Sequence, residues 1–149
     1  TSPGIPSPPM DTFDFPNLVV ALDQAKGLTT HGYYFLTRDG KEEFYSFDRL
    51  RTEAMRRGAW LRSKGMKQGD RLAMVMPDGE DFVPTFFGAV WAGIVPVPLY
   101  PPLSLGKLDA YIEALVSIMG KAEPTWLATA AKLEAVLWSG AAKVKSLPR

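Results

Sequence analysis

Residues 82–103 read FVPTFFGAVWAGIVPVPLYPPL and contain no charged side chain, although charged residues make up 22% of the chain. A transmembrane helix needs about 20 mainly apolar residues in one helical run, so the length of this stretch would suffice. Its second half contains four prolines, Pro96, Pro98, Pro101 and Pro102. Each would remove a backbone donor and clash with the preceding helical turn. We therefore predict that the stretch is not one continuous helix and that the chain has no transmembrane segment.

The same stretch divides into a helix and a strand. Residues 81–92 can be helical, because Pro84 falls within the first turn and Gly93 can end the helix in a left-handed conformation. Residues 94–100 are apolar and β-branched, which is typical of a short strand. Pro96 and Pro98 fit such a strand only if their nitrogens face away from a hydrogen-bonding partner.

The residues before this stretch predict a hairpin between two helices. Residues 17–26 have an apolar helical face, which Gly27 ends, and residues 33–37 and 43–46 alternate around an Asp-Gly pair that is typical of hairpins. Ser46 can cap the following helix, which Gly65 closes. The apolar stripe of that helix is Phe47, Leu50, Ala54, Gly58 and Leu61.

Strands and helices alternate through the rest of the chain. After a strand at residues 71–76 come the helix and strand above, a helix capped by Ser104, a strand at 125–130, a helix at 131–138 and an apolar segment at 144–147. Buried strands that alternate with helices of about 10 to 15 residues indicate βαβ crossovers. We predict an α/β fold, in which a partial parallel sheet of three or four strands with flanking helices follows a small N-terminal β-hairpin. Such a sheet suggests a fragment of a larger domain.

Composition limits the function classes. Lys and Arg number 17 against 16 Asp and Glu, so no overall positive charge favours nucleic acid as a partner. The chain has no cysteine, which excludes a disulfide framework, a zinc–thiolate site and thiol catalysis. Residues 1–14 are proline-rich and predict an arm or linker rather than a signal peptide. We expect a cytoplasmic protein.

The candidate chemical groups do not form a site. His31 is the single histidine and is expected in a surface turn, so it has no second histidine or cysteine as a metal-binding partner. Asp78, Glu80 and Asp81 are explained as charges that favour the start of a helix. Residues 104–107 (SLGK) lack the length of a phosphate-binding loop. We therefore predict no catalytic, cofactor-binding or metal-binding residue within this chain.

Two further clusters are interpreted as structural. The basic cluster is interpreted as a solvated helix face, and it consists of Arg49, Arg51, Arg56, Arg57, Arg62, Lys64 and Lys67. The aromatic residues Phe82, Phe86, Phe87 and Trp91 have helical spacing and are expected in the core.

Three motifs give the chain a family resemblance. They are an aromatic-Ser-Phe-Asp-x-Leu helix start, the turn GMKQGDRL at residues 65–72, and the run FFGAVWAGIVPVP at residues 86–98. Together they resemble the opening of adenylate-forming enzymes, the superfamily of acyl-CoA synthetases, luciferases and peptide-synthetase adenylation domains. The ending PLYPP at residues 98–102 is similar to that of long-chain fatty acyl-AMP ligases. The resemblance implies that residues 15–149 are a truncated N-terminal segment of an AMP-binding domain, part of the large N-terminal domain of such an enzyme.

The resemblance also implies a reaction and its partners. A fatty-acid carboxylate attacks the α-phosphorus of Mg-ATP, pyrophosphate leaves, and the acyl adenylate passes to the phosphopantetheine thiol of an acyl carrier protein. The implied setting is lipid metabolism or polyketide or lipopeptide biosynthesis. ATP and Mg²⁺ are expected to serve the parent enzyme, whose catalytic residues lie beyond Arg149. We expect the 149-residue chain to be inactive and to bind neither ATP nor Mg²⁺ alone.

Other functions stay open at this point. The chain could be a non-catalytic interaction module that docks a carrier protein or a neighbouring synthase domain. It could also be the start of an acyl-CoA synthetase or of an amino-acid adenylation domain. A downstream phosphate loop rich in Ser, Thr and Gly would favour an enzyme over the interaction module.

Overall fold

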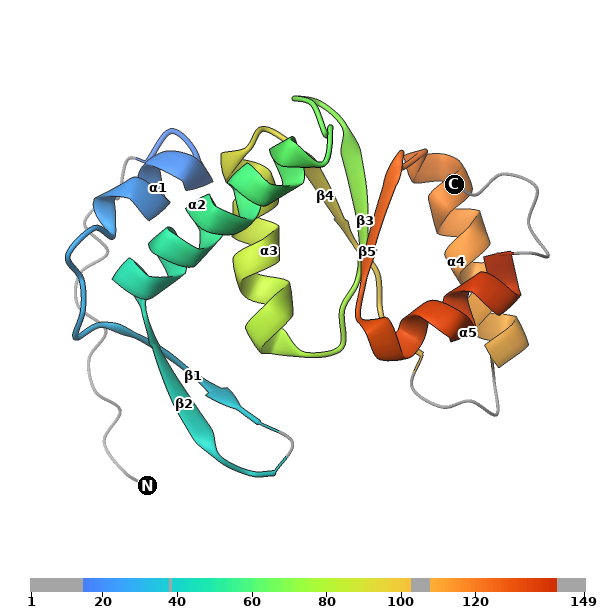
Figure 1. Cartoon of the computed structure of the whole chain (residues 1–149), viewed down its shortest axis with the longest axis horizontal. Coiled ribbons are helices and arrows are strands. Elements are labelled where there is room, and N and C mark those ends of the chain that lie inside the picture. Colours follow the sequence, from blue (N-terminus) through green and yellow to red (C-terminus); the bar gives the residue numbers. More distant parts are fainter. Residues whose placement is uncertain (1–14, 38, 103–107, 142–149) are drawn as a thin grey trace, which may run out of the picture.

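The computed structural model describes residues 15–37, 39–102 and 108–141. Its elements follow the predicted order, with a hairpin between two helices and then alternating strands and helices (Figure 1). They are α1 (Leu18–Gln24), β1 (Gly32–Leu36), β2 (Glu42–Ser46), α2 (Phe47–Ser63), β3 (Arg71–Val75), α3 (Gly79–Trp91), β4 (Val95–Pro98), α4 (Leu108–Ala122), β5 (Trp126–Thr129) and α5 (Ala131–Ala141). The expected Ser104 cap and the apolar segment at 144–147 lie outside the described residues.

The N-terminal hairpin forms as predicted. Strands β1 and β2 pair antiparallel, with Tyr34 opposite Phe44. Gly40 in the turn has a φ of 77°, a left-handed conformation that glycine adopts without steric cost. The β1–β2 hairpin lies beside α1 and α2 and projects away from the larger sheet (Figure 1).

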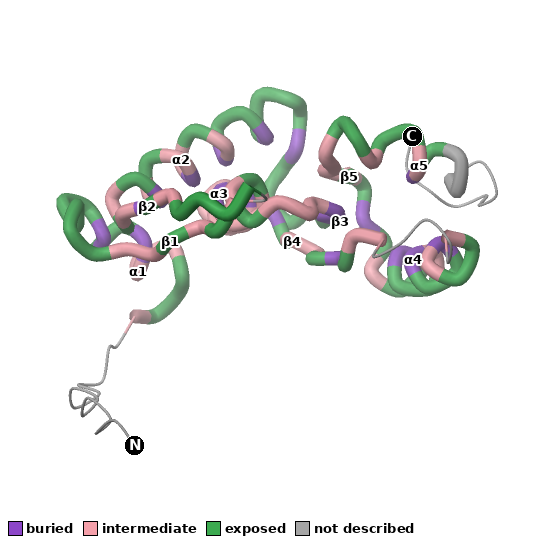
Figure 2. Tube along the Cα trace, turned by 90° about the horizontal axis from the view of Figure 1, so that it is seen from below, coloured by how far each residue is buried: buried purple, intermediate pink, exposed green. Residues whose placement is uncertain are grey.

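Helix α2 begins at the predicted cap. The Arg49 backbone N–H donates to Ser46 Oγ at 3.1 Å, which satisfies one of the unpaired donors of the first turn. Leu50, Ala54, Gly58 and Leu61 are buried as predicted, whereas most of the outer surface of α2 is exposed (Figure 2). The prediction for Phe47 was wrong, because its side chain is 37% exposed at the start of the helix, beside the hairpin.

The larger sheet is parallel, with strand order β4-β3-β5. Its middle strand is buried on both faces, and Leu72, Ala73, Met74 and Val75 are each 0% exposed. Leu72 and Met74 pack in one core cluster with Leu61 of α2 and Ala89 of α3. On the opposite face, a second cluster combines Ala73 and Val75 of β3 with side chains of α4 and α5, namely Leu115, Met119 and Leu137. The predicted α/β fold, a partial parallel sheet with flanking helices, is therefore confirmed (Figure 1).

The apolar stretch divides as predicted. Helix α3 ends at Trp91, and Gly93 follows with a φ of 74°, before β4 begins at Val95. The Val95 backbone N–H donates to the carbonyl of Asp70 at 2.8 Å, just before β3. The Leu99 backbone N–H donates to the carbonyl of Met74, in β3, at 2.9 Å. Because donors alternate along a strand, the nitrogens of Pro96 and Pro98 face the outer edge. None of the helices in the described part of the chain has the length and apolar character that a membrane span requires.

Candidate functional site

The carboxyl ends of β3 and β5 form the first candidate site. The chain leaves β3 toward α3 on one face of the sheet and leaves β5 toward α5 on the opposite face. Ligands of open parallel sheets bind at such a reversal of direction, beyond the carboxyl ends of the strands. Here the Lys132 ammonium, in the first turn of α5, lies 2.7 Å from a carboxylate oxygen of Asp78, just before α3.

This ion pair changes the interpretation of Asp78. Asp78 occupies the N-cap position of α3, but its side chain makes no capping hydrogen bond. Its carboxylate instead connects the two loops at the carboxyl edge, across 54 positions of sequence. Opposite charges in contact compensate each other, and the pair is partly exposed, so we assign it a role in fixing the loops. No sequence pattern pointed to Lys132, because only the packing of β5 beside β3 brings it to Asp78.

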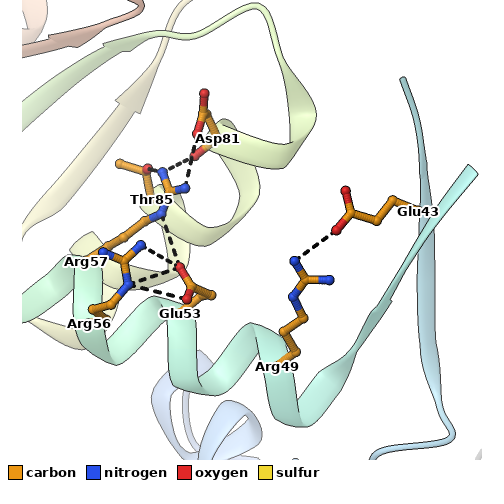
Figure 3. Close-up of polar contacts among 7 residues, drawn as sticks. All are labelled: Glu43, Arg49, Glu53, Arg56, Arg57, Asp81 and Thr85. Carbon is orange, nitrogen blue, oxygen red and sulfur yellow. Dashed lines mark hydrogen bonds and ion pairs between the residues drawn. The ribbon is translucent and has the colours of Figure 1, made fainter. Parts of the chain in front are cut away.

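The second candidate is a polar network between α2 and α3, shown in Figure 3. One guanidinium nitrogen of Arg57 donates to Thr85 Oγ1 at 2.7 Å and to the Asp81 carbonyl at 3.1 Å. The other terminal nitrogen donates to the Asp81 carboxylate at 3.1 Å. Arg57 thus joins α2 to the first two turns of α3. Its Nε is buried and has no hydrogen-bond partner among the described groups.

The neighbouring residues of the network stay at the surface. Arg56 donates to the carboxylate of Glu53, with a shortest separation of 2.7 Å between the two side chains. This hydrogen bond is the main cause that lowers the pKa of Glu53, against a smaller opposing effect of burial. Arg56 is 65% exposed and Arg57 22% exposed, so adjacent arginines of one helix have different surroundings.

A hollow of about 660 Å³ lies beside β5 and is the third candidate. Side chains of α2 line one side, and side chains of α4 and α5 line the opposite side. We call it the β5 groove; its lining includes Trp60, Trp126, Leu127, Ala128, Leu137 and Trp138. The side chains of Arg56, Arg57 and Glu134 supply its charged groups. The groove is therefore mainly apolar and has charges of both signs.

The interpretation of the basic cluster as a solvated face needs correction. Arg51 forms an ion pair with Asp23 at 2.9 Å and is only 20% exposed, and Arg57 is held between two helices. Arg49 pairs with Glu43 at 2.9 Å and lies 3.8 Å from the centre of the Tyr45 ring. These arginines connect elements of the fold, and sequence spacing could not distinguish them from solvated ones.

The other groups considered from sequence are dispersed. His31 is exposed in the turn before β1, with its Nδ1 3.1 Å from Thr30 Oγ1. Phe82 and Phe86 pack against the α2–α3 core cluster, and Phe87 packs against the cluster that contains Tyr45, as expected for core residues. Residues 104–107 lie outside the described part of the chain.

No metal site is formed by the described residues. They contain no group of three or more His, Cys, Asp or Glu side chains that could hold a metal ion. The carboxylates of Asp78 and Asp81 point to different partners, Lys132 and Arg57. The expectation that this chain supplies no catalytic, cofactor-binding or metal-binding residue stays a prediction.

Comparison with known proteins gives the family. Residues 24–146 match the AMP-binding enzyme family. Over 111 residues the chain is 37% identical to a putative acyl-CoA synthetase of Caulobacter vibrioides, covering 74% of this chain and 19% of the relative. Over 48 residues it is 42% identical to the long-chain-fatty-acid–AMP ligase FadD23 of Mycobacterium tuberculosis, covering 32% of this chain and 8% of the relative.

Comparison with solved structures indicates the same family. A structure from studies of fatty acyl-adenylate ligases of E. coli and L. pneumophila superposes with a TM-score of 0.80 at 29% identity. The match covers 91% of this chain and 24% of that structure, so the chain spans about a quarter of the enzyme that it resembles. The chain therefore belongs to the AMP-binding, adenylate-forming enzymes, and fatty acyl-AMP ligases are among its structural neighbours.

Proposed function

We propose that the protein to which this chain belongs is a fatty acyl-AMP ligase. It activates a fatty acid with ATP and Mg²⁺, and it transfers the acyl group from the adenylate to an acyl carrier protein in the cytoplasm. The observation that carries this proposal is the likeness to a fatty acyl-adenylate ligase over nine-tenths of the chain. The sequence PLYPP, which starts at the last residue of β4, supports the same branch because it resembles the corresponding sequence of long-chain fatty acyl-AMP ligases.

In this proposal the described residues position the site and do not react. Activation requires cations and backbone donors around the phosphoryl oxygens, where negative charge develops. Four arginines of α2, Arg49, Arg51, Arg56 and Arg57, form ion pairs with carboxylates of this chain, and Lys132 pairs with Asp78. We assign ATP and Mg²⁺ to other parts of the longer protein, and we assign to β3, β4 and their helices the support of the sheet.

The test is pyrophosphate exchange with the full-length protein. We expect incorporation of labelled pyrophosphate into ATP when a long-chain fatty acid is added, and none when amino acids are added. Exchange with amino acids alone would identify an amino-acid adenylation domain and overturn the proposal. We expect no exchange by the 149-residue chain under either condition.

A second candidate is an acyl-CoA synthetase, which the Caulobacter relative favours because it matches a longer part of the chain than FadD23 does. The acceptor distinguishes the two. A fatty acyl-AMP ligase should load the phosphopantetheine thiol of a carrier protein and give no acyl-CoA. Release of acyl-CoA at a comparable rate would instead support the second candidate. If the full-length protein exchanged no pyrophosphate with any acid, a non-catalytic interaction module would be the better assignment.

A further inference from the structure

Strand β4 is a border strand of the parallel sheet, because its neighbour among the described residues is β3 alone. The backbone N–H groups of Val95 and Leu99 donate toward the β3 side, at 2.8 and 2.9 Å. Donors alternate along a strand, so residues 96 and 98 face the outer edge. Both are prolines, which have no N–H group. The outer edge of this four-residue strand therefore offers carbonyl acceptors and no backbone donor.

Apart from its prolines, β4 has the character of a strand that pairs between molecules. Residues 94–100 (IVPVPLY) are apolar and rich in β-branched side chains, and residues 82–103 contain no charge. Val95 is 47% exposed and Tyr100 is 88% exposed. Proteins protect such edges with charges, bulges or prolines. The register between β4 and β3 is regular, without a bulge, so the prolines are the feature that can protect this edge.

A strand that joined β4 would leave some of its own backbone groups without partners. Its carbonyls on the β4 side would meet the rings of Pro96 and Pro98, where an ordinary strand presents N–H groups. A carbonyl that loses water and gains no donor is destabilising, because the cost of its desolvation is not offset. Pairing at this edge is therefore unfavourable in spite of the apolar side chains.

The other border strand shows that the sheet itself does not require proline at such positions. The Thr125 backbone N–H donates to the carbonyl of Arg71 at 3.0 Å, so residues 126 and 128 of β5 face away from β3. These residues are Trp126 and Ala128, which both keep their N–H groups. Proline thus occupies the outward positions of β4 and not those of β5.

We propose that Pro96 and Pro98 close the β4 edge to strand pairing, both between copies of this chain and within the longer protein. Strand β4 is then the border of this sheet in the whole enzyme as well. The prolines keep an uncharged apolar strand from associating with other molecules. The proposal rests on backbone donors and does not depend on which acid the enzyme activates.

Restoring the donors tests the proposal in the 149-residue chain. For the double variant Pro96→Val, Pro98→Val, we expect the mass measured by light scattering to rise about twofold over that of the unmodified chain as the protein is concentrated. The new amides at positions 96 and 98 should become protected from hydrogen exchange over the same range, which would locate the association at β4. Rapid exchange of both amides at every concentration would overturn the proposal.

Two comparisons separate the donors from other effects of substitution. Val95→Ile enlarges an exposed apolar side chain and adds no outward donor, so this control should keep the mass of the unmodified chain. If it associated as strongly as the double variant, apolar surface would be the cause and the role of the prolines would be refuted. Should circular dichroism show the double variant unfolded, Pro96→Val and Pro98→Val decide separately. Each restores one donor, and a lack of association in both would contradict the proposal.

The full-length protein tests whether β4 stays a border strand. In the dilute full-length double variant, the amides at 96 and 98 should exchange within about tenfold of the rate of unprotected amides, because no other strand covers them. The Val97 amide faces β3 and is the internal control, which should be protected. Slow exchange at 96 and 98 in dilute protein would show that another segment pairs with β4, and the proposal would then be wrong.

Discussion

The two faces of the parallel sheet are covered by helix pairs of different kinds. On one face, α2 and α3 approach so closely that a Cβ on Gly58 would lie 2.6 Å from the carbonyl oxygen of Gly88. An arginine, Arg57, lies between the same two helices and is partly buried. On the other face, Trp138 of α5 and Ile118 of α4 are 52% and 46% exposed.

The interface between α2 and α3 is therefore closed, whereas the exposed side chains of α4 and α5 can still accept a partner. Where two backbones touch, side-chain size is fixed and polar groups must find partners within the interface. Apolar side chains that line a groove still contact solvent on one side. Each therefore contributes less to the free energy of folding than a fully buried side chain does. Substitutions of the buried residues between α2 and α3 should therefore cost more stability than matched substitutions of the exposed residues that line the β5 groove.

The largest contrast is expected from leucine truncation. Leu61 is 1% exposed in the α2–α3 core, so Leu61→Ala should lower the free energy of unfolding by about 2–5 kcal/mol. Leu127→Ala in the β5 groove is the control and should cost clearly less, because that side chain is 36% exposed. Urea unfolding followed by circular dichroism measures both. Equal losses would show that the groove is already filled in solution.

Glycine substitution tests the close approach of the helices. Gly58→Ala should destabilise the protein by about 1–3 kcal/mol, because the new methyl group would meet the Gly88 backbone and the Trp91 ring. Gly120→Ala, in α4, is the control, since nothing lies within 4 Å of a Cβ there. It should stabilise by roughly 0.5–1 kcal/mol through helix propensity. Thermal unfolding measures both variants. If Gly58→Ala were stabilising, the two helices would be farther apart than the structure places them.

The two adjacent arginines allow a similar comparison within α2. Arg57→Met should cost about 1–2 kcal/mol, because Thr85 would lose its 2.7 Å hydrogen bond at a site where it is 5% exposed. Arg56→Met removes a solvent-exposed pair with Glu53 and should cost less than about 0.5 kcal/mol. Chemical unfolding of both variants measures the difference. If Arg56→Met were the more harmful substitution, the assignment of Arg57 as the connection to α3 would be wrong.

The smallest effect concerns the hairpin beside the α2–α3 face. Burial raises the pKa of Tyr33 to about 12, helped by nearby Tyr45 and opposed by Arg49. Its hydroxyl is buried and has no hydrogen-bond partner among the described groups, so Tyr33→Phe should be neutral or stabilising by up to about 1 kcal/mol at pH 7.

The pH dependence of this variant follows from the direction of the shift. A raised folded-state pKa means that the neutral Tyr33 contributes fully below its ordinary value of 10.0, and that this contribution is lost as the pH rises toward about 12. Stability of the unmodified chain should therefore fall more steeply than that of Tyr33→Phe between pH 10 and pH 12, measured by thermal unfolding. Parallel pH profiles would show that the Tyr33 hydroxyl is in contact with solvent.

Much of the fold could be predicted from sequence because its signals are local. The cap at Ser46, the Asp-Gly turn and the prolines of β4 act on their own neighbours, and the structure confirms each of them. Element bounds were less accurate. Helix α3 begins at Gly79 rather than at residue 81, and α1 is shorter than residues 17–26 at both ends, because helix ends depend on packing as well as on sequence.

The sequence by itself determined the order of helices and strands, the break in the apolar stretch and the resemblance to adenylate-forming enzymes. Tertiary structure alone decided which charges meet. Arg57 and Thr85 are 28 positions apart, and Lys132 and Asp78 are 54 positions apart. Their spacing follows no helix or strand period, so they come together only when helices pack and β5 is placed beside β3. Backbone periodicity acts over a few residues, whereas a site is assembled by contacts between elements that are distant in sequence.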